Sequence, residues 1–345
     1  MTSPERPLGT IALVTGATGF LGQSLVRRLV GQGAVVRCLL RATSSAEPLL
    51  ASLSPDERPR IQIVRFHGRT SDLAAALEGC SVVYHVAAAL RGSAAVLCRA
   101  NVSFTRQLFA AALATPIKRI VLVSSMGVYA TEALPAGGTL DEGCSLDPHP
   151  ERRDSYTLSK ILQERLAWEA HEDHDLPVVV VRPGVIYGPG REIPVTRLGL
   201  PIGRWILWVV GRRAMPYCYV ENCADGVALA GLVEGIEGQA FNLIDDESPS
   251  ATEIFETNRR MGLRFRRLPI TYSLMLALAA LLSRWHEHSR GQVPLVLTPY
   301  RVQAIWKRLN YPNDKAKRTL SWSPKVSTAV ALEATLRHAL ARVSQ

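Results

Sequence analysis

The sequence lacks the features that mark several classes of protein. Only six of its 345 residues are cysteine, and they form no CxxC pair and no spacing typical of a disulfide framework. Charged residues make up 20% of the chain and hydrophobic residues 47%, which excludes a disordered or collagen-like chain. The uncharged run over residues 268–283 has sixteen residues, fewer than the ~20 that a helix needs to cross a bilayer.

Targeting, metal and nucleic-acid motifs are also missing. The first ten residues contain no apolar core of a signal peptide, and the cysteine usage suits a reducing compartment, so we expect a cytoplasmic protein. The pairs His171/His174 and His286/His288 each lack the third ligand that a zinc site needs, so no metal is expected. Zinc-finger spacings and the aromatic RNA-binding pattern are absent, so no nucleic-acid partner is expected.

Positive charge is present and is concentrated in one part of the chain. The formal net charge is +10, and residues 256–320 alone hold 13 Lys and Arg against three acidic residues, so the remainder is neutral. Two interpretations stay open. The sector is a solvated, arginine-rich surface, or it binds an anionic ligand or an anionic membrane.

Short β-branched runs alternate with helical patterns along most of the chain. Strands are expected over 10–15, 34–40, 61–66, 81–86, 119–124, 177–182 and 240–243, and helices over 20–30, 101–113 and 155–171. This alternation predicts an α/β fold with a Rossmann-type, doubly wound parallel sheet. Ligands of such sheets bind at the carboxyl ends of the strands.

The alternation is interrupted after residue 187, and the length suggests about two domains. We expect a sheet domain over 1–187 with 217–245, a smaller and mostly helical lobe over 188–216 with 246–330, and a C-terminal helix or tail over 331–345. The lobe should close over the carboxyl edge of the sheet and supply substrate contacts.

A glycine-rich segment ends the first expected strand and begins the first helix. In its GxxGxxG pattern Gly16 permits a tight turn, Gly19 lets a pyrophosphate approach the backbone, and Gly22 lets the helix pack closely. Phosphates bind the free N–H groups at such a helix N-terminus. We therefore expect a dinucleotide-binding loop made of Gly16, Thr18, Gly19, Phe20, Leu21 and Gly22.

The end of the second strand indicates which coenzyme binds. An NAD-binding loop places Asp or Glu here for the ribose 2′-hydroxyl, but no acid stands between Gly22 and Glu47. Arg41 instead offers a planar cation that suits a 2′-phosphate, and Thr43 and Ser44 could add hydroxyl donors. The segment predicts NADP, with NAD as the alternative if Arg41 is only a surface residue.

Tyr156 and Lys160 stand four residues apart, so they share one face of the helix expected there. An adjacent ammonium favours the phenolate and lowers the pKa of a tyrosine. Such a pair could exchange a proton with a substrate hydroxyl while a nicotinamide moves a hydride.

A second YxxxK match, at Tyr311 and Lys315, is interpreted as structural. Pro312 forbids a normal helical hydrogen bond at that place, and we expect Asp314 to cap the helix that follows. The two side chains therefore should not share a helical face.

Two further polar positions lie at the expected carboxyl edge. Ser124 and Ser125 end the fifth strand, where a hydroxyl can bind the reacting carbonyl oxygen. Asn101 begins the helix after the fourth strand. It could orient the Lys160 ammonium through water, or it could only cap the helix, and both interpretations stay open.

Four segments, in this order and spacing, resemble the extended short-chain dehydrogenase/reductase family: TGATGFLG, VLVSSMGVYA, YTLSK and VRPGVIYGPG. The resemblance runs from about residue 11 to residue 336. It implies Ser125, supported by Ser124, together with Tyr156 and Lys160 as the catalytic residues. It also implies that the cofactor contacts Ala87, Asn101, Lys160, Pro183, Val185 and Ile186.

Departures from the family pattern narrow the expected substrate. Members that act on nucleotide-diphospho-sugars usually carry Asn where this chain has Val185 and Arg where it has Met215. The segment RPGVIYGPG is closer to the branch of 3β-hydroxysteroid dehydrogenases and dihydroflavonol reductases. The family's Gly-Asp after the third strand is Gly68-Arg69 here, so either Asp72 or Arg69 would have to contact the adenine.

These observations lead us to expect an NAD(P)-dependent oxidoreductase that interconverts a secondary alcohol and a ketone, or an aldehyde, on an apolar, sterol-like or lipid-like substrate. Two alternatives stay open: a sugar-nucleotide epimerase or dehydratase, and a non-catalytic cofactor-sensing protein. For the assembly we expect a homodimer.

Two apolar stretches flanked by arginines remain to be placed. Residues 268–283 follow Arg266 and Arg267 and precede Arg284, and residues 204–213 repeat the pairing on a smaller scale. Both stretches could build the core of the lobe. Alternatively they form an apolar substrate pocket or a rim that contacts a membrane, since Trp and Arg suit that interface.

Overall fold

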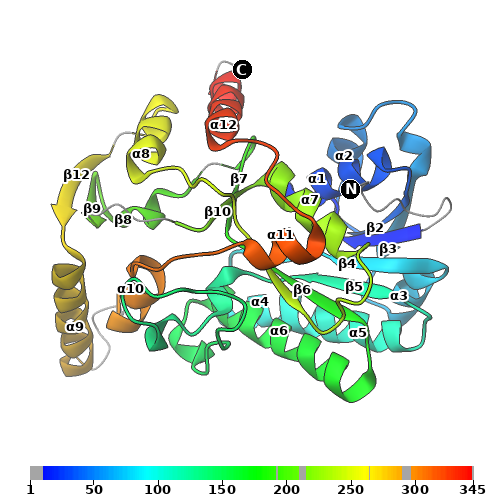
Figure 1. The fold of residues 1–345 in the computed structure, drawn as a ribbon, viewed down its shortest axis with the longest axis horizontal. Coiled ribbons are helices and arrows are strands. Elements are labelled where there is room, and N and C mark those ends of the chain that lie inside the picture. Colours follow the sequence, from blue (N-terminus) through cyan, green and yellow to red (C-terminus); the bar gives the residue numbers. More distant parts are fainter. Residues whose placement is uncertain (1–10, 192, 210–214, 264, 290–296, 344–345) are drawn as a thin grey trace.

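The computed structural model describes residues 11–191, 193–209, 215–263, 265–289 and 297–343. A seven-stranded sheet runs in the order β11-β6-β5-β4-β1-β2-β3, with every strand parallel to its neighbours (Figure 1). Its strands are β1 (Ile11–Thr15), β2 (Val35–Arg41), β3 (Ile61–Phe66), β4 (Cys80–His85), β5 (Arg119–Val123), β6 (Val178–Pro183) and β11 (Ala240–Leu243). The strand order reverses between β1 and β4, which confirms the doubly wound α/β fold.

Helices cover both faces of this sheet. In β1 the buried side chains alternate: Ala12 and Val14 belong to one core cluster and Leu13 to the other. The first cluster is shared with α1 (Phe20–Gly31), α2 (Glu47–Ala51) and α7 (Val220–Ala230), and the second with α3 (Thr70–Leu77), α5 (Phe104–Leu113) and α6 (Ser155–His174). The short α4 (Ala94–Leu97) continues through a π-helix over Cys98–Ser103 into α5.

The lobe contains a sheet as well as helices. Strands β8 (Gly199–Ile202) and β9 (Trp205–Val209) form an antiparallel hairpin, and β12 (Arg266–Ile270) pairs parallel with β9. Around them lie α8 (Ala251–Arg260), α9 (Tyr272–His288) and α10 (Pro299–Trp306). In Figure 1 these elements form the left side of the molecule, away from β2 and β3. The described part of the apolar stretch 204–213 therefore contains the strand β9.

Two segments connect the lobe to the larger sheet. Strand β7 (Val185–Tyr187) pairs parallel with β10 (Tyr217–Tyr219), and their tyrosine rings pack edge to face. Helix α11 (Asp314–Leu320) returns to the sheet domain, where the Asn313 side chain donates to the Ile244 carbonyl at 2.8 Å. The chain ends in α12 (Thr328–Val343). Among the described residues, no helix combines the length and the apolar character needed to cross a membrane.

Around α11 the structure corrects one sequence expectation and agrees with another. Asp314 is the first residue of α11, and Asn313 stands at the capping position, so the predicted cap is wrong by one residue. Tyr311 precedes that helix while Lys315 lies in it, so the pair does not share a helical face. The expected strand start at residue 10, the segment 210–214 and the basic residues 264 and 290 lie outside the described residues.

Candidate active site

A cavity of about 810 Å³ lies at the carboxyl ends of β1, β2, β4 and β5. This is the edge at which open parallel sheets bind their ligands. Of the residues expected at the site, the following line it: Gly16, Thr18, Gly19, Phe20, Leu21, Gly22, Arg41, Ala87, Tyr156, Lys160 and Ile186. Ser125, Asn101, Pro183 and Val185 are not part of its wall.

The glycine loop has the shape that a phosphate cradle needs. Gly16 adopts φ +71°, and a Cβ there would lie 2.7 Å from the Cα of Ala87. A Cβ on Gly22 would overlap the Gly16 carbonyl oxygen, so only glycine lets α1 pack against the loop. Gly19 caps α1 without a side-chain hydrogen bond, which leaves the first-turn N–H groups for a ligand. The loop fits the diphosphate of a dinucleotide.

The rim of the cavity near β2 carries positive charge. Arg41, the last residue of β2, and Ser44 both line the cavity, and Arg65 donates to the backbone carbonyls of both. Arg99 also lines the cavity, and no Asp or Glu is among the described residues that line it. This corner suits a phosphate better than a ribose hydroxyl that needs a carboxylate partner.

Asp72 accepts hydrogen bonds from the backbone at the start of α3. Its carboxylate accepts the backbone N–H of His67 at 2.7 Å and that of Arg69 at 3.4 Å, in the first turn of α3. These hydrogen bonds hold the pKa of Asp72 below its usual value. Gly68 and Phe66, rather than Arg69 or Asp72, line the cavity at this end.

Tyr156 and Lys160 extend from the first two turns of α6 into the cavity. The helix begins here because the Asp154 side chain accepts the Thr157 N–H at 3.0 Å. Burial raises the pKa of the Tyr156 phenol, and the nearby Arg191 and Arg197 guanidinium groups oppose that rise. The sequence expectation of a lowered tyrosine pKa therefore does not hold in this arrangement, because burial outweighs the nearby positive charge.

The Lys160 ammonium is held by oxygen atoms of the protein. Its Nζ donates to the Val123 carbonyl at 2.7 Å and to the Gln163 side-chain oxygen. Gln163 in turn donates to Thr105 Oγ1 at 2.7 Å. Burial lowers the pKa of Lys160 to about 7, against the opposing effect of the Glu164 carboxylate. The ammonium thus loses its proton far more readily than a surface lysine does.

A buried histidine completes this polar cluster. His85, the last residue of β4, lies 3.1 Å from the Gln163 side-chain nitrogen and 2.7 Å from the hydroxyls of Thr15 and Thr105. Burial, reinforced by the Lys160 charge, lowers the pKa of His85 to about 3, so the ring is neutral. Sequence reasoning missed His85 and Gln163. The available signal was a polar residue at the end of an apolar strand.

The two serines after β5 have different partners. Ser124 lines the cavity, but its hydroxyl donates to the buried Glu164 carboxylate. Ser125 accepts the Gly127 N–H at 3.1 Å, which leaves its own hydroxyl proton for a ligand. Of the two, Ser125 is the better donor toward a carbonyl oxygen, although it lies just beyond the cavity wall.

Glu164 belongs to a second buried network that the sequence analysis missed. Its carboxylate accepts from the Arg182 guanidinium at 2.9 and 2.5 Å and from the Trp168 indole at 3.1 Å. Arg182 also donates to the Tyr129 hydroxyl at 2.8 Å. The signal for this network was one arginine in the otherwise apolar strand β6. The pair fixes α6, and with it Tyr156, against the sheet.

Asn101 is not a helix cap, because it lies inside the π-helix before α5. Its fully buried side chain accepts the Ala89 N–H at 2.7 Å and donates to the Ala89 carbonyl at 3.1 Å and to Ser159 Oγ at 2.9 Å. These bonds tie the loop after β4 to the second turn of α6. Asn101 thus positions two walls of the cavity, which fits the frequent occurrence of π-helical turns at functional sites.

The segment expected to contact the nicotinamide is only partly in reach. Ile186 lines the cavity, whereas Pro183 is buried at the end of β6. The Val185 N–H donates to the Pro216 carbonyl at 2.6 Å, so it is already used. Of these three residues, Ile186 is the one placed to contact a ligand.

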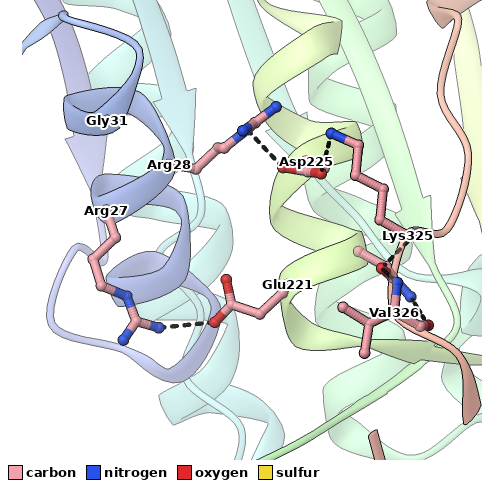
Figure 2. Close-up of a pocket in the computed structure, with 8 residues that line it drawn as sticks. Arg27, Arg28, Gly31, Glu221, Asp225, Lys325 and Val326 are labelled. Atoms are coloured by element: carbon pink, nitrogen blue, oxygen red, sulfur yellow. Dashed lines mark hydrogen bonds and ion pairs between the residues drawn. The ribbon is translucent and has the colours of Figure 1, made fainter. Parts of the chain in front are cut away.

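A second, smaller cavity of about 330 Å³ lies between α1 and α7. Figure 2 shows that its charged side chains point toward one another. Arg27 pairs with Glu221 at 2.8 Å, and Asp225 accepts from Arg28 at 2.6 Å and from Lys325 at 3.1 Å. These ion pairs connect α1 to α7 and to Lys325, so we assign this place a structural role.

The described residues contain no group of three His, Cys, Asp or Glu side chains that could hold a metal ion. The Nδ1 atom of His171 lies 2.9 Å from the Leu176 carbonyl oxygen, next to the end of α6. The absence of a metal stays a prediction.

A protein-family model matches more than half of the chain. The model of the NAD dependent epimerase/dehydratase family matches residues 12–243, a span that contains the glycine loop, Tyr156 and Lys160. The chain belongs to this family. Membership confirms the resemblance found in the sequence, and the protein is an NAD(P)-dependent oxidoreductase of the short-chain dehydrogenase/reductase type.

Two curated relatives match nearly the whole chain. A 4-hydroxy-2-methyl-3-oxo-4-farnesyl-3,4-dihydroquinoline-1-oxide ketoreductase of Stigmatella aurantiaca is 31% identical over 335 residues, covering 93% of this chain and 94% of that protein. A 3 beta-hydroxysteroid dehydrogenase/Delta 5-->4-isomerase of Mycobacterium tuberculosis is 29% identical over 342 residues, covering 93% and 88%. Both span the sheet domain and the lobe together.

Among solved structures, UDP-glucuronic acid 4-epimerase from Bacillus cereus in complex with NAD superposes with a TM-score of 0.70. It is 21% identical, and the match covers 96% of this chain and 99% of that one. At this identity the likeness shows a shared fold and says nothing of the substrate.

Proposed function

We propose that the protein is an NADP(H)-dependent oxidoreductase that interconverts a ketone or aldehyde and an alcohol on an apolar, sterol-like or lipid-like substrate. The observation that carries the proposal is one cavity whose wall contains both the glycine loop and the Tyr156–Lys160 pair. The first element fits a dinucleotide and the second an acid/base step at a substrate oxygen.

The preference for NADP rests on the charged rim. Arg41 and Ser44 line the cavity where a 2′-phosphate would lie, and no carboxylate is among the described lining residues. A bound NADPH would supply the hydride, and the glycine loop with the N-terminus of α1 would hold its diphosphate.

The residues of the chain divide the remaining work. The Tyr156 phenol, whose pKa burial raises above its ordinary value, is protonated at neutral pH, and this form donates to a carbonyl oxygen during reduction. The Ser125 hydroxyl stabilises the charge that develops on that oxygen. Lys160, whose Nζ is held by Val123 and Gln163, would contact the cofactor ribose.

The apolar substrate is supported by two positions and by the relatives. Sugar-nucleotide enzymes usually carry Asn and Arg at two positions where this chain has Val185 and Met215. Val185 lies in β7, and Met215 is buried in the main core cluster. The Stigmatella aurantiaca ketoreductase acts on a farnesylated quinoline oxide, as its name states, and the Mycobacterium tuberculosis enzyme on a steroid. A homodimer stays a prediction.

The proposal is tested by a screen of apolar ketones, aldehydes and secondary alcohols, following the absorbance of NADPH. Turnover of at least one apolar compound, with NADPH used better than NADH, is the expected result. A protein that retains its cofactor tightly and interconverts UDP-sugars without net NADPH consumption would instead be an epimerase. A protein that binds NADPH but turns over none of these classes would fit a cofactor sensor.

A further inference from the structure

Helix α9 lies on the surface of the lobe, with one face packed on a small core cluster and the other exposed. Only Met275 and Ala279 of its seventeen residues are buried, although Tyr272–Ser283 contains no charge. The outward stripe consists of Leu274, Ala277, Leu281 and Trp285, spaced so that they share one helical face. Their large members are 58% (Leu274), 64% (Leu281) and 56% (Trp285) exposed.

The neighbouring sheet edge continues this exposed surface. β12, the edge strand, runs directly into α9, and its Leu268 is half exposed. The tip of the β8–β9 hairpin exposes Ile202 and Trp205, and the Arg266 N–H ties this tip to β12 through the Arg204 carbonyl at 2.9 Å. Figure 1 shows α9, β12 and the hairpin at one end of the molecule.

Four exposed arginines lie among these apolar side chains: Arg204, Arg266, Arg267 and Arg284. The Arg266 guanidinium lies 5.6 Å from the centre of the Trp205 ring, and Arg267 lies 4.3 Å from that of Phe255. Within the described ranges none of the four arginines pairs with a carboxylate, and Glu287 is the acid nearest to them in sequence. We call the exposed residues of α9, β12 and the hairpin tip, with these arginines, the apolar–basic face.

We propose that the apolar–basic face docks on an anionic lipid bilayer. Leucine and tryptophan side chains can enter the boundary between headgroups and acyl chains while arginines contact lipid phosphates, so both burial and Coulomb attraction favour binding. Exposed apolar side chains are concentrated here: of the thirteen large ones on the described surface, six lie on this face. A concentration of this kind marks a contact surface.

The charge of the face favours lipid over a second copy of the chain. In a twofold dimer the same patch meets itself, so four arginines would face four arginines. Those like charges would repel, whereas phosphatidylglycerol or another anionic lipid neutralises them. This inference goes beyond the proposed function and does not depend on which substrate the enzyme uses.

Vesicle co-sedimentation tests the proposal with the full chain. Vesicles of phosphatidylcholine alone are compared with vesicles of phosphatidylcholine mixed with phosphatidylglycerol, at low and at high salt. We expect binding to the mixed vesicles, weaker binding to phosphatidylcholine, and release at high salt. A wild-type protein that binds neither kind of vesicle at low salt would overturn the proposal.

A pair of matched variants locates the contact. Leu281→Glu with Arg284→Glu changes α9, and Val330→Glu with Arg342→Glu makes the same charge change on α12, where Val330 is 58% exposed. The α9 variant should lose binding to the mixed vesicles by about tenfold or more, while the α12 variant should bind like wild type. Equal binding of both variants would contradict the proposal.

A milder pair guards against a folding defect. Arg204→Gln with Arg284→Gln should weaken binding, whereas Arg318→Gln with Arg342→Gln, which removes the same charge elsewhere, should weaken it much less. NADPH binding confirms that each variant is folded. If light scattering shows a wild-type dimer that the α9 variant converts to a monomer, the face is a contact between two copies and the proposal is wrong.

Discussion

The core of the sheet domain and the apolar–basic face of the lobe differ in where their charged side chains lie and what they contact. In the sheet domain two buried arginines pair with buried carboxylates, Arg182 with Glu164 and Arg153 with Asp147 at 2.8 Å, and buried Lys160 is held by neutral oxygen atoms. In the lobe the arginines of the apolar–basic face lie outside, beside exposed leucine and tryptophan. The difference indicates a division of labour: the sheet domain fixes the position of reacting groups, and the lobe presents a surface for contact.

The largest effect is expected when one partner of a buried ion pair is removed. Glu164→Gln leaves the Arg182 guanidinium, which is 5% exposed, without its carboxylate. Breaking such a pair costs about 3–5 kcal/mol, so the free energy of unfolding should fall by that order. The control Arg284→Gln on α9 should change it by less than about 0.5 kcal/mol. Urea unfolding measures the free energy of unfolding of both variants. Equal decreases in the two variants would contradict the difference between the buried pair and the exposed face.

The next effect is a pH dependence that buried His85 adds to the stability of the sheet domain. His85 has a folded pKa of about 3, below its ordinary value near 6.5, so only the unfolded chain takes up a proton between these values. Stability should therefore be lost as the pH falls from about 6.5 toward 3, by a few kcal/mol at most. His85→Gln keeps a polar group and does not titrate. It should reduce this loss of stability at low pH, which we call the acid limb.

A matched histidine outside the core provides the control. His149 lies on the surface with 54% of its side chain exposed, beside Glu151. His149→Gln should leave the pH dependence of the urea midpoint unchanged. If the His85 and His149 variants show the same acid limb as wild type, buried His85 is not its source.

A smaller effect concerns coenzyme choice at the rim of the cavity. Arg41→Asp replaces an attraction for the 2′-phosphate with a repulsion, so the ratio of NADPH to NADH affinity should fall by about tenfold or more. Titration of both coenzymes with wild type and variant measures the ratio. An unchanged ratio would show that Arg41 only borders the site. The variant should leave vesicle binding as it is, because Arg41 lies in the sheet domain.

The sheet was predictable because its signals are local. Runs such as Ile61–Phe66 and Ala240–Leu243 fall where the alternating pattern placed them, and the glycine loop follows its strand as expected. The lobe sheet was not predictable, because β9 pairs with β12 some sixty residues further along the chain. No local pattern encodes such a pairing.

The same limit applies to the candidate site. Tyr156 and Lys160 share a helix, so their spacing was enough to bring them together. Gln163 and His85 are 78 residues apart, and their contact depends on how α6 packs against β4. Asn101 shows the intermediate case: the sequence singled it out, but its bonds to Ala89 and Ser159 required the fold.

The most direct test of the account is the Tyr156→Phe variant, assayed with the best substrate from the screen and with NADPH. The change removes the only proton that the phenol can donate and leaves the ring in place, so turnover should fall by at least about a hundredfold. NADPH affinity and binding to anionic vesicles should stay near the wild-type values. Turnover that survives the substitution would contradict the assignment of Tyr156 as the acid/base and with it the proposed mechanism.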